Sequence, residues 1–276
     1  MPTTHDIHAY LLEHSPWVNR ENTVDGCKNG DPMREVRQAG VAWFGSLDTM
    51  KKAHADGCDL LIVHEPIFWE HSAEEKNWRV IEPGVAKQQF LDDSGLVVLR
   101  AHDSWDNWPG IGIRDSWAAG LGLTKRIKEG TVWNLHGMYE IAPQSLREFA
   151  RYIARKIAPL GEDSVQVIGD PERIVSRPAL GVGCIGPDKE MVESGADVMI
   201  VCYDGACYWA VRERLAEMGV AIITLEHGTT EMWGMENLRH HLAEAFSPTP
   251  FRYYAEHPRT WTVRTVDSSG TCRDLG

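Results

Sequence analysis

The feature that most restricts the possible folds is a series of short apolar runs separated by stretches of helical periodicity. The run at 60–63 is wholly apolar and has the length of a buried strand, and it ends abruptly in His64, Glu65 and Pro66. Further short runs that are mainly apolar lie at 96–101, 198–201 and 221–225. Strands that alternate with helices predict an α/β protein.

Caps and glycines define the predicted helices between these runs. Residues 145–158 form the clearest helix, with Ser145 as the N-cap and Glu148 three residues later. Further helices are predicted at 46–56, 85–93, 189–194 and 206–218. The helix at 145–158 carries an arginine at every fourth position: Arg147, Arg151 and Arg155. This stripe is interpreted as a solvent-exposed face.

Composition narrows the class of protein. A net charge of −12 argues against a nucleic-acid-binding surface, which needs clustered Lys and Arg. The six cysteines contain no C-x-x-C pair, so neither a disulfide framework nor a structural zinc site is indicated. The sequence contains neither an apolar run of membrane-spanning length nor a signal-peptide pattern. We therefore expect a reduced, cytoplasmic protein with neither nucleic-acid nor membrane partners.

Two segments of the chain resemble each other. The segment GCDLLIVHE (57–65) aligns with GADVMIVCY (195–203), and both are preceded and followed by the same order of elements. Chance similarity between two buried strands is the alternative, but the matched Gly, Asp and apolar positions favour a duplicated helix–strand–helix–strand unit. The copies differ where the strand ends, because Cys202 stands in place of His64 and Tyr203 in place of Glu65. The first copy is therefore predicted to be specialised.

Side chains able to bind metal follow three of the predicted strands. These are His64 and Glu65, then His102, Asp103 and Asp106, then Glu226, His227 and Glu231. Ligand sites in open α/β sheets lie at the carboxyl ends of strands, so the three groups are expected to converge. The four-residue spacing of His227 and Glu231 puts both on one helix face. Taken alone, that pair is more often a surface pair, and His102 equally fits a structural role.

Other chemistries find less support. The sequence has no G-x-S-x-G, Walker or G-x-G-x-x-G motif after a strand. Cys202 is interpreted as a small buried residue rather than a nucleophile. Four tryptophans flank the candidate groups and are expected to wall a pocket: Trp69, Trp105, Trp108 and Trp233.

At these residues the sequence resembles the NGG-interacting-factor-three-like family, also called GTP cyclohydrolase I type 2 homologues. The family pattern DLLIVHHP resembles DLLIVHEP at 59–66, and AHTNLD…G.ND.LA..LGL resembles AHDSWDNWPGIGIRDSWAAGLGL at 101–123. The pattern GDP.R.V.R.A resembles GDPERIVSRPALGVG at 169–183, and GHY.SE…L resembles EHGTTEMWGMENL at 226–238. The motifs occur in the family's order over roughly 20–245.

The resemblance implies a fold of two related lobes, a toroidal hexamer and a dinuclear metal centre in the cleft. The ligands implied by motif position are His64, Glu65, Asp106, His227 and Glu231. Glu65 is the main departure, since the family usually has a second histidine there. A carboxylate at this position makes the site harder and more anionic, which favours Mn, Fe or Zn.

Together these observations predict a dinuclear metal-binding protein, a possible hydrolase of a small substrate such as a nucleotide or phosphoester. Asp106 and Glu231 are expected to bridge the ions, and His102 and Glu226 to orient ligands or relay protons. The alternative is a non-catalytic ring oligomer that the ions stabilise. Residues 1–135 and 221–276 are predicted to form the metal-site lobe, and 136–220 the second lobe.

Overall fold

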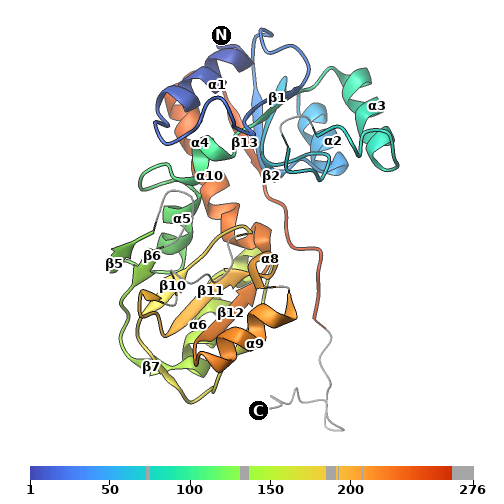
Figure 1. Cartoon of the computed structure of the whole chain (residues 1–276). Coiled ribbons are helices and arrows are strands. Elements are labelled where there is room, and N and C mark those ends of the chain that lie inside the picture. The colour runs from blue at the N-terminus through green and yellow to red at the C-terminus, as the bar shows by residue number, and fades with distance from the viewer. Residues whose placement is uncertain (73–74, 131–136, 185–190, 192, 207, 263–276) are drawn as a thin grey trace.

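The computed structural model describes residues 1–72, 75–130, 137–184, 191, 193–206 and 208–262, and the account below concerns these residues. The chain has a mixed α/β fold built around two sheets, which form the upper and lower parts of Figure 1. The predicted α/β class is confirmed.

The first sheet contains the His64 strand at its centre. Its strands, in spatial order, are β1 (Gly26–Asn29), β4 (Val97–Arg100), β3 (Leu60–Glu65), β2 (Ala39–Phe44) and β13 (Phe251–Tyr254). All neighbours in this sheet are parallel except β1, which pairs antiparallel with β4. A central parallel strand is covered on both faces, which explains the unbroken apolar run in β3.

The second sheet is mixed. Its strands, in spatial order, are β5 (Arg126–Glu129), β6 (Gly137–Tyr139), β10 (Pro178–Leu180), β11 (Val198–Cys202), β12 (Ala221–Leu225) and β8 (Gln166–Ile168). The central strands β10, β11 and β12 are parallel. A separate small sheet pairs β7 (Gln144–Ser145) with β9 (Ile174–Val175). The predicted lobe boundary before residue 221 separates β12 from β11, two strands that the structure pairs directly.

Helices cover the outer faces of both sheets and fill the space between them. They are α1 (Thr4–Glu13), α2 (Leu47–Ala55), α3 (Gly84–Ser94), α4 (Asp103–Asp106), α5 (Ile113–Gly120), α6 (Leu146–Ile157), the 3₁₀ helix η1 (Ala158–Leu160), α8 (Tyr203–Ala206), α9 (Trp209–Glu217) and α10 (His227–Ala245). The helix α10 leaves the second sheet and packs against α5 and β2, so it joins the two parts of the molecule (Figure 1).

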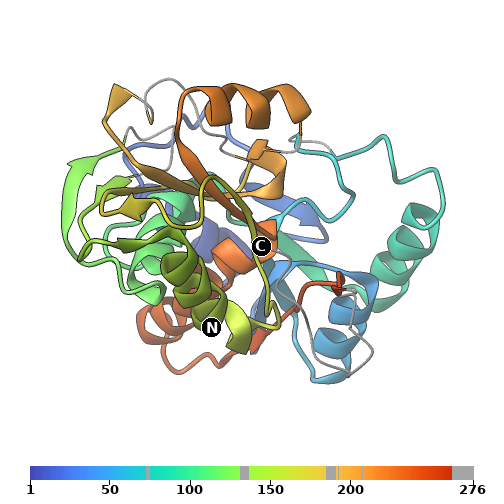
Figure 2. The same ribbon diagram turned by 90° about the horizontal axis from the view of Figure 1, so that it is seen from below.

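Alternate residues of the central strands face two different cores. Leu60 and Ile62 of β3 belong to a core that also contains Val198 and Ile200 of β11, so the two sheets share it. Leu61 and the other residues of opposite parity in β3 pack under α2 and α3. In the second sheet, Met199 and Val201 of β11 point to the other face and pack beneath α9. Figure 2 shows α9 and α6 on opposite faces of this sheet.

The predicted helix boundaries agree with the structure where caps were present. Ser145 Oγ accepts a hydrogen bond from Glu148 N at the start of α6. Gly95 ends α3 with a φ of +64°, in the left-handed region that favours glycine. The helix predicted at 189–194 lies largely outside the described residues. None of the described helices has the length and apolar character that crossing a membrane requires.

Candidate metal centre

The first half of the site forms where β3 and β4 end. His64 is the fifth residue of β3 and is fully buried, and Asp106 lies on the short helix α4 that follows β4. His64 Nε2 lies 3.3 Å from Asp106 Oδ1 and 3.5 Å from Glu231 Oε2. The ring of His102 stacks on that of His64, with 4.3 Å between centroids, and its Nδ1 lies 3.3 Å from Asp106 Oδ2. Residues from three strand ends therefore meet here, as the sequence predicted.

The second half forms at the start of α10, immediately after β12. His227 Nε2 lies 3.2 Å from Glu231 Oε1 and 3.4 Å from Glu65 Oε1. The two oxygens of Glu231 thus face different histidines, with Oε2 toward His64 and Oε1 toward His227. Asp106, by contrast, faces His64 and His102. Of the two carboxylates predicted to bridge, Glu231 has the geometry of a bridge between the two halves.

His64 and His227 are each held by the ring nitrogen that faces away from the cluster. His102 is held by Nδ1, the nitrogen that also faces Asp106, and its Nε2 lies 4.0 Å from Glu65 Oε1. His64 Nδ1 lies 3.2 Å from the Ala101 carbonyl oxygen, and His102 Nδ1 lies 2.9 Å from Asp103 Oδ1. His227 Nδ1 lies 2.5 Å from Asp204 Oδ2. A ring nitrogen that donates to a carbonyl or carboxylate leaves the other nitrogen as a lone pair, which is the usual state of a metal-binding histidine.

Two residues that were not predicted lie beside Glu231. The indole Nε1 of Trp43 donates to Glu231 Oε2 over 2.6 Å and holds the carboxylate. Gly183 leaves room for it, because a Cβ at this position would come within 2.9 Å of Glu231 Oε1 and 3.3 Å of His227 Nε2. Gly183 closes the motif at 169–183, and Trp43 lies at the carboxyl end of β2. Applying the strand-end rule to β2 would have found Trp43.

The carboxylates govern the protonation of this cluster. Burial opposes the charged form of His64, but Glu231 and Asp106 outweigh it and raise its pKa to about 9. Burial likewise opposes protonation of His227, and Glu231 and Asp204 raise its pKa well above the usual range. Burial alone would raise the pKa of Glu65, yet the neighbouring histidines hold it far below its ordinary value. The carboxylates therefore make a positive charge electrostatically favourable in this cluster.

The residues present fit a metal ion. His64 Nε2 is buried and faces Asp106 and Glu231 at 3.3 and 3.5 Å, but it makes no hydrogen bond of regular geometry within the described residues, as expected of a nitrogen that shares an ion with these carboxylates. Ligands about 2.1 Å from a tetrahedral ion are about 3.4 Å apart, and the spacings of 3.2 to 3.5 Å found here match that value. Several overlapping sets of donors have the proximity that an ion needs: His64, His102 and Asp106; His64, Glu65 and Glu231; Glu65, His71 and His102; Cys202, Asp204 and His227.

Comparisons with known proteins identify the family. The profile of Duf34/NIF3 (NGG1p interacting factor 3) matches residues 3–255. The chain belongs to this family. A GTP cyclohydrolase 1 type 2 homolog from Chlamydia pneumoniae is 24% identical over 247 residues, covering 86% of this chain and 94% of that protein.

Two solved structures share the fold of this chain. The Staphylococcus aureus protein SA1388 superposes with a TM-score of 0.75 at 18% identity, covering 95% of this chain and 99% of that one. A Bacillus cereus protein related to NIF3 gives a TM-score of 0.76 at 12% identity, covering 95% of this chain and 99% of that one. At these identities the likeness concerns the fold alone.

Two other predicted residues lie at the edge of the cluster. Glu226 is the N-cap of α10, and its Oε1 accepts a hydrogen bond from Thr260 Oγ1 over 2.5 Å. Its carboxylate is thereby held at the rim. Cys202 is buried as interpreted, burial raises its pKa to about 11, and its thiol donates to the Gly183 carbonyl oxygen. A protonated thiol in this state is a weak nucleophile.

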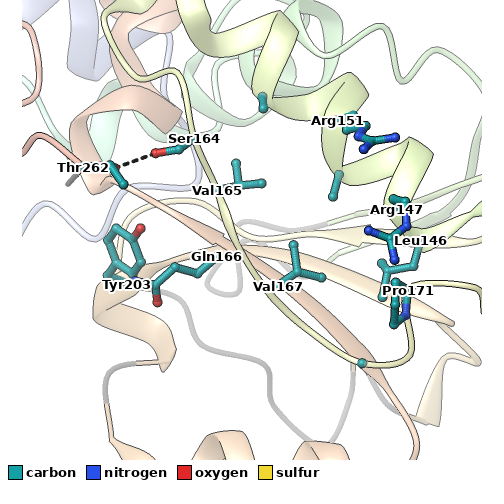
Figure 3. Close-up of a pocket in the computed structure, with 13 residues that line it drawn as sticks. Leu146, Arg147, Arg151, Ser164, Val165, Gln166, Val167, Pro171, Tyr203 and Thr262 are labelled. Atoms are coloured by element: carbon teal, nitrogen blue, oxygen red, sulfur yellow. Dashed lines mark hydrogen bonds between the residues drawn. The ribbon is translucent and has the colours of Figure 1, made fainter. Parts of the chain in front are cut away.

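A cavity of about 540 Å³ lies apart from this cluster, between α6 and the edge strand β8 (Figure 3). Arg147 and Arg151 line it, and they pair with Glu172 and Glu148 at 3.1 and 3.0 Å. Such exposed pairs contribute little energy and indicate a solvated helix face. The basic stripe of α6 therefore matches its predicted role as a solvent-exposed face.

Proposed function

We propose that the protein is a metal-dependent hydrolase with two metal positions that share Glu231. The observation that carries the proposal is the convergence of Asp106 and Glu231 on the buried His64 Nε2, at 3.3 and 3.5 Å. The first position would be held by His64, Asp106 and Glu231, with His102 beside them. The second would be held by Glu65, His227 and Glu231.

Divalent ions in such a site would supply Lewis acidity and lower the pKa of a water molecule. The protein's own groups prepare the rest. Trp43 fixes Glu231, Gly183 leaves room for its carboxylate, and Asp204 fixes the ring of His227. Preorganised ligands of this kind need no rearrangement during the reaction.

A cleft beside the cluster has the size to hold a small substrate. It has a volume of about 460 Å³ and adjoins His227 and Trp43, with Phe44 and Arg259 along its wall. This size is typical of small-molecule sites. The half-buried rings of Trp43 and Phe44 provide apolar surface, and Lys52 and Arg259 provide positive charge beside the carboxylates that also line the cleft, Asp48, Glu226 and Glu256. We propose a small substrate with a charged group, such as a nucleotide or another phosphoester.

Metal content tests the ligand assignment directly. The His64→Ala and Asp106→Ala proteins should lose bound metal in elemental analysis, while the His54→Ala protein, altered at an exposed histidine of α2, should keep it. Hydrolysis of a panel of nucleotides and phosphoesters should then require the metal. Full metal content in both ligand variants would refute the assignment.

A second candidate function is a non-catalytic ring oligomer, a hexamer by family resemblance. Tyr208 and Trp209, at the start of α9, are 63% and 66% exposed, which is unusual for large aromatic residues and typical of interaction surfaces. Removal of metal distinguishes the two functions. An enzyme should lose turnover, whereas an assembly protein should lose its oligomeric state in light scattering.

We further propose that the two sheets derive from a duplication. The parallel pairs β3–β4 and β11–β12 support this proposal. In each pair the first strand directly follows a Gly-x-Asp, and a helical segment connects the first strand to the second.

A further inference from the structure

A row of aromatic rings leads away from the candidate metal centre along the ends of β2 and β3. The ring centroid of Trp43 lies 5.7 Å from that of His227, and the ring of Phe44 follows at 6.3 Å. Trp69, in the loop after β3, lies 6.5 Å from Phe44. The row therefore begins at a proposed metal ligand and reaches Trp69, which is 43% exposed.

Trp69 has an unusual backbone conformation. Its φ is +58°, in the left-handed region that bulky residues rarely adopt. Strained positions of this kind cluster at active sites and ligand-binding segments. The edge of Trp78 packs against the indole, with 6.3 Å between centroids and an interplanar angle of 81°. The strained backbone thus presents a supported aromatic surface to solvent.

A pocket of about 430 Å³ lies at this part of the row, with Phe44 and Trp69 among its walls. This volume is typical of small-molecule sites. Phe44 ends β2 and Trp69 follows β3, so the pocket lies at the edge where α/β sheets bind ligands. The residues that it shares with the cleft beside the metal cluster are Phe44, Ser46, Asp48 and Arg259. One ligand can therefore extend from the cleft into this pocket.

Two cations restrict the kind of ring that the pocket accepts. The Lys87 ammonium lies 4.6 Å from the ring centroid of Phe44 and 4.5 Å from that of Trp69, and hydrogen bonds to two backbone carbonyl oxygens hold it there. Arg259 also lines the pocket, and the described lining contains a single carboxylate, that of Asp48. A cationic ligand of the kind that aromatic cages bind is therefore disfavoured, and an uncharged ring is favoured.

We propose that this pocket is a stacking subsite for the nucleobase of the substrate. The base lies on Trp69, the charged group lies in the adjoining cleft at the metal centre, and Arg259 contacts the anionic part between them. Every nucleobase has a π-face, so the subsite accepts more than one base. This inference rests on the proposed function and narrows its substrate class to nucleotides, as opposed to phosphoesters without a ring.

Two matched probes test the subsite. Adenosine 5′-monophosphate and ribose 5-phosphate share the sugar and the phosphate, and only the first has a base. Isothermal titration calorimetry of the wild-type protein should show that adenosine monophosphate binds about 5- to 150-fold more tightly, the effect of one base–aromatic stack. Equal affinities, or no binding of adenosine monophosphate, would overturn the subsite.

Substitutions assign the effect to residues. The Trp69→Ala protein should lose the preference for adenosine monophosphate, and Trp69→Phe, which keeps a stacking surface, should retain most of it. Arg259→Met should weaken the binding of both probes alike, because both carry the phosphate. Trp209→Ala, at a 66% exposed tryptophan of α9, is the control.

An unchanged preference in the Trp69→Ala protein would overturn the role of Trp69. If that protein instead changed its oligomeric state in light scattering, Trp69 would belong to a contact between copies of the chain. Metal content separates this inference from the proposed function. A protein that retains metal but shows no preference between the probes loses only the subsite. A protein that binds no metal but shows a Trp69-dependent preference keeps the subsite and refutes the hydrolase.

Discussion

Trp43 and Glu231 lie 188 positions apart in the chain, and the indole N–H of Trp43 donates to Glu231 Oε2 over 2.6 Å. The bond joins β2 of the first sheet to α10, which emerges from the second. It fixes the carboxylate that faces both His64 and His227.

The Trp43→Phe protein should therefore bind metal more weakly. Phenylalanine keeps most of the ring but cannot donate to Glu231, and the loss of an outer hydrogen bond typically costs about 10- to 100-fold in metal affinity. Competition with a chelator measures the change. The matched control is Trp78→Phe, at a 45% exposed tryptophan, which should leave metal affinity unchanged. Equal affinity in all three proteins would contradict the role of Trp43.

Gly183→Ala should also impair the centre, because the new Cβ would lie 2.9 Å from Glu231 Oε1. Backbone strain also contributes, since Gly183 has a φ of +58°. Gly195→Ala separates the two effects: its φ is +83°, but open space surrounds the site of the Cβ. We expect both variants to lose about 1 kcal/mol of unfolding free energy and only Gly183→Ala to lose metal. Metal loss in both would assign the effect to strain.

Asp204→Asn should weaken metal binding by disturbing His227. The carboxylate accepts the Nδ1 proton of His227, whereas an amide can present its NH₂ group and favour the wrong tautomer. A loss of about 10- to 100-fold in affinity is expected, without a change in thermal stability of the metal-free protein. Glu213→Gln, at an exposed position of α9, is the control. Unaltered affinity in the Asp204→Asn protein would remove this residue from the centre.

The buried Lys87, which lies away from the proposed metal ligands, should make the stability of the protein depend on pH. Its side chain is 2% exposed, and burial lowers its pKa to about 8, although Glu256 and Glu75 oppose the shift. Between pH 8 and the usual lysine value of 10.5, the unfolded chain binds more protons than the native one. The unfolding free energy contributed by this group should thus rise across that window, by on the order of 3 kcal/mol.

Urea denaturation of the wild-type and Lys87→Met proteins at pH 7 and pH 10 isolates this contribution. Methionine retains the buried stem, and all other titrating groups are common to both proteins. The wild type should gain stability relative to the variant at the higher pH. Parallel pH profiles of the two proteins would show that Lys87 keeps an ordinary pKa.

The strand ends were the part of the site that the sequence could predict. The apolar run of β3 placed His64 and Glu65 at a buried edge, and the four-residue spacing placed His227 beside Glu231. Asp204 and Arg100 could not be found in this way. Arg100 contacts His64 and His71, which lie in or after the neighbouring strand β3, and Asp204 contacts His227, which follows the strand β12 next to β11. No local sequence pattern encodes these side-chain pairings.

The fold was predictable to a similar degree. The strands β3, β4, β11 and β12 were recognised because parallel central strands are continuously apolar. The strand β2 was missed, since its segment AGVAWF has neither a continuous bulky run nor flanking turn signals. The pairing of β13 with β2 joins the two ends of the sequence, and only the three-dimensional fold reveals it.

The ligands of the candidate centre come from the ends of β3 and β4 in one sheet and from the helix that leaves β12 in the other. Neither half of the chain carries all the donors of the proposed two-ion centre. That centre is complete only after both sheets have formed and α10 has docked against β2. Uptake of the full complement of metal would then serve as a check on maturation, because only a fully assembled chain brings all of these donors together.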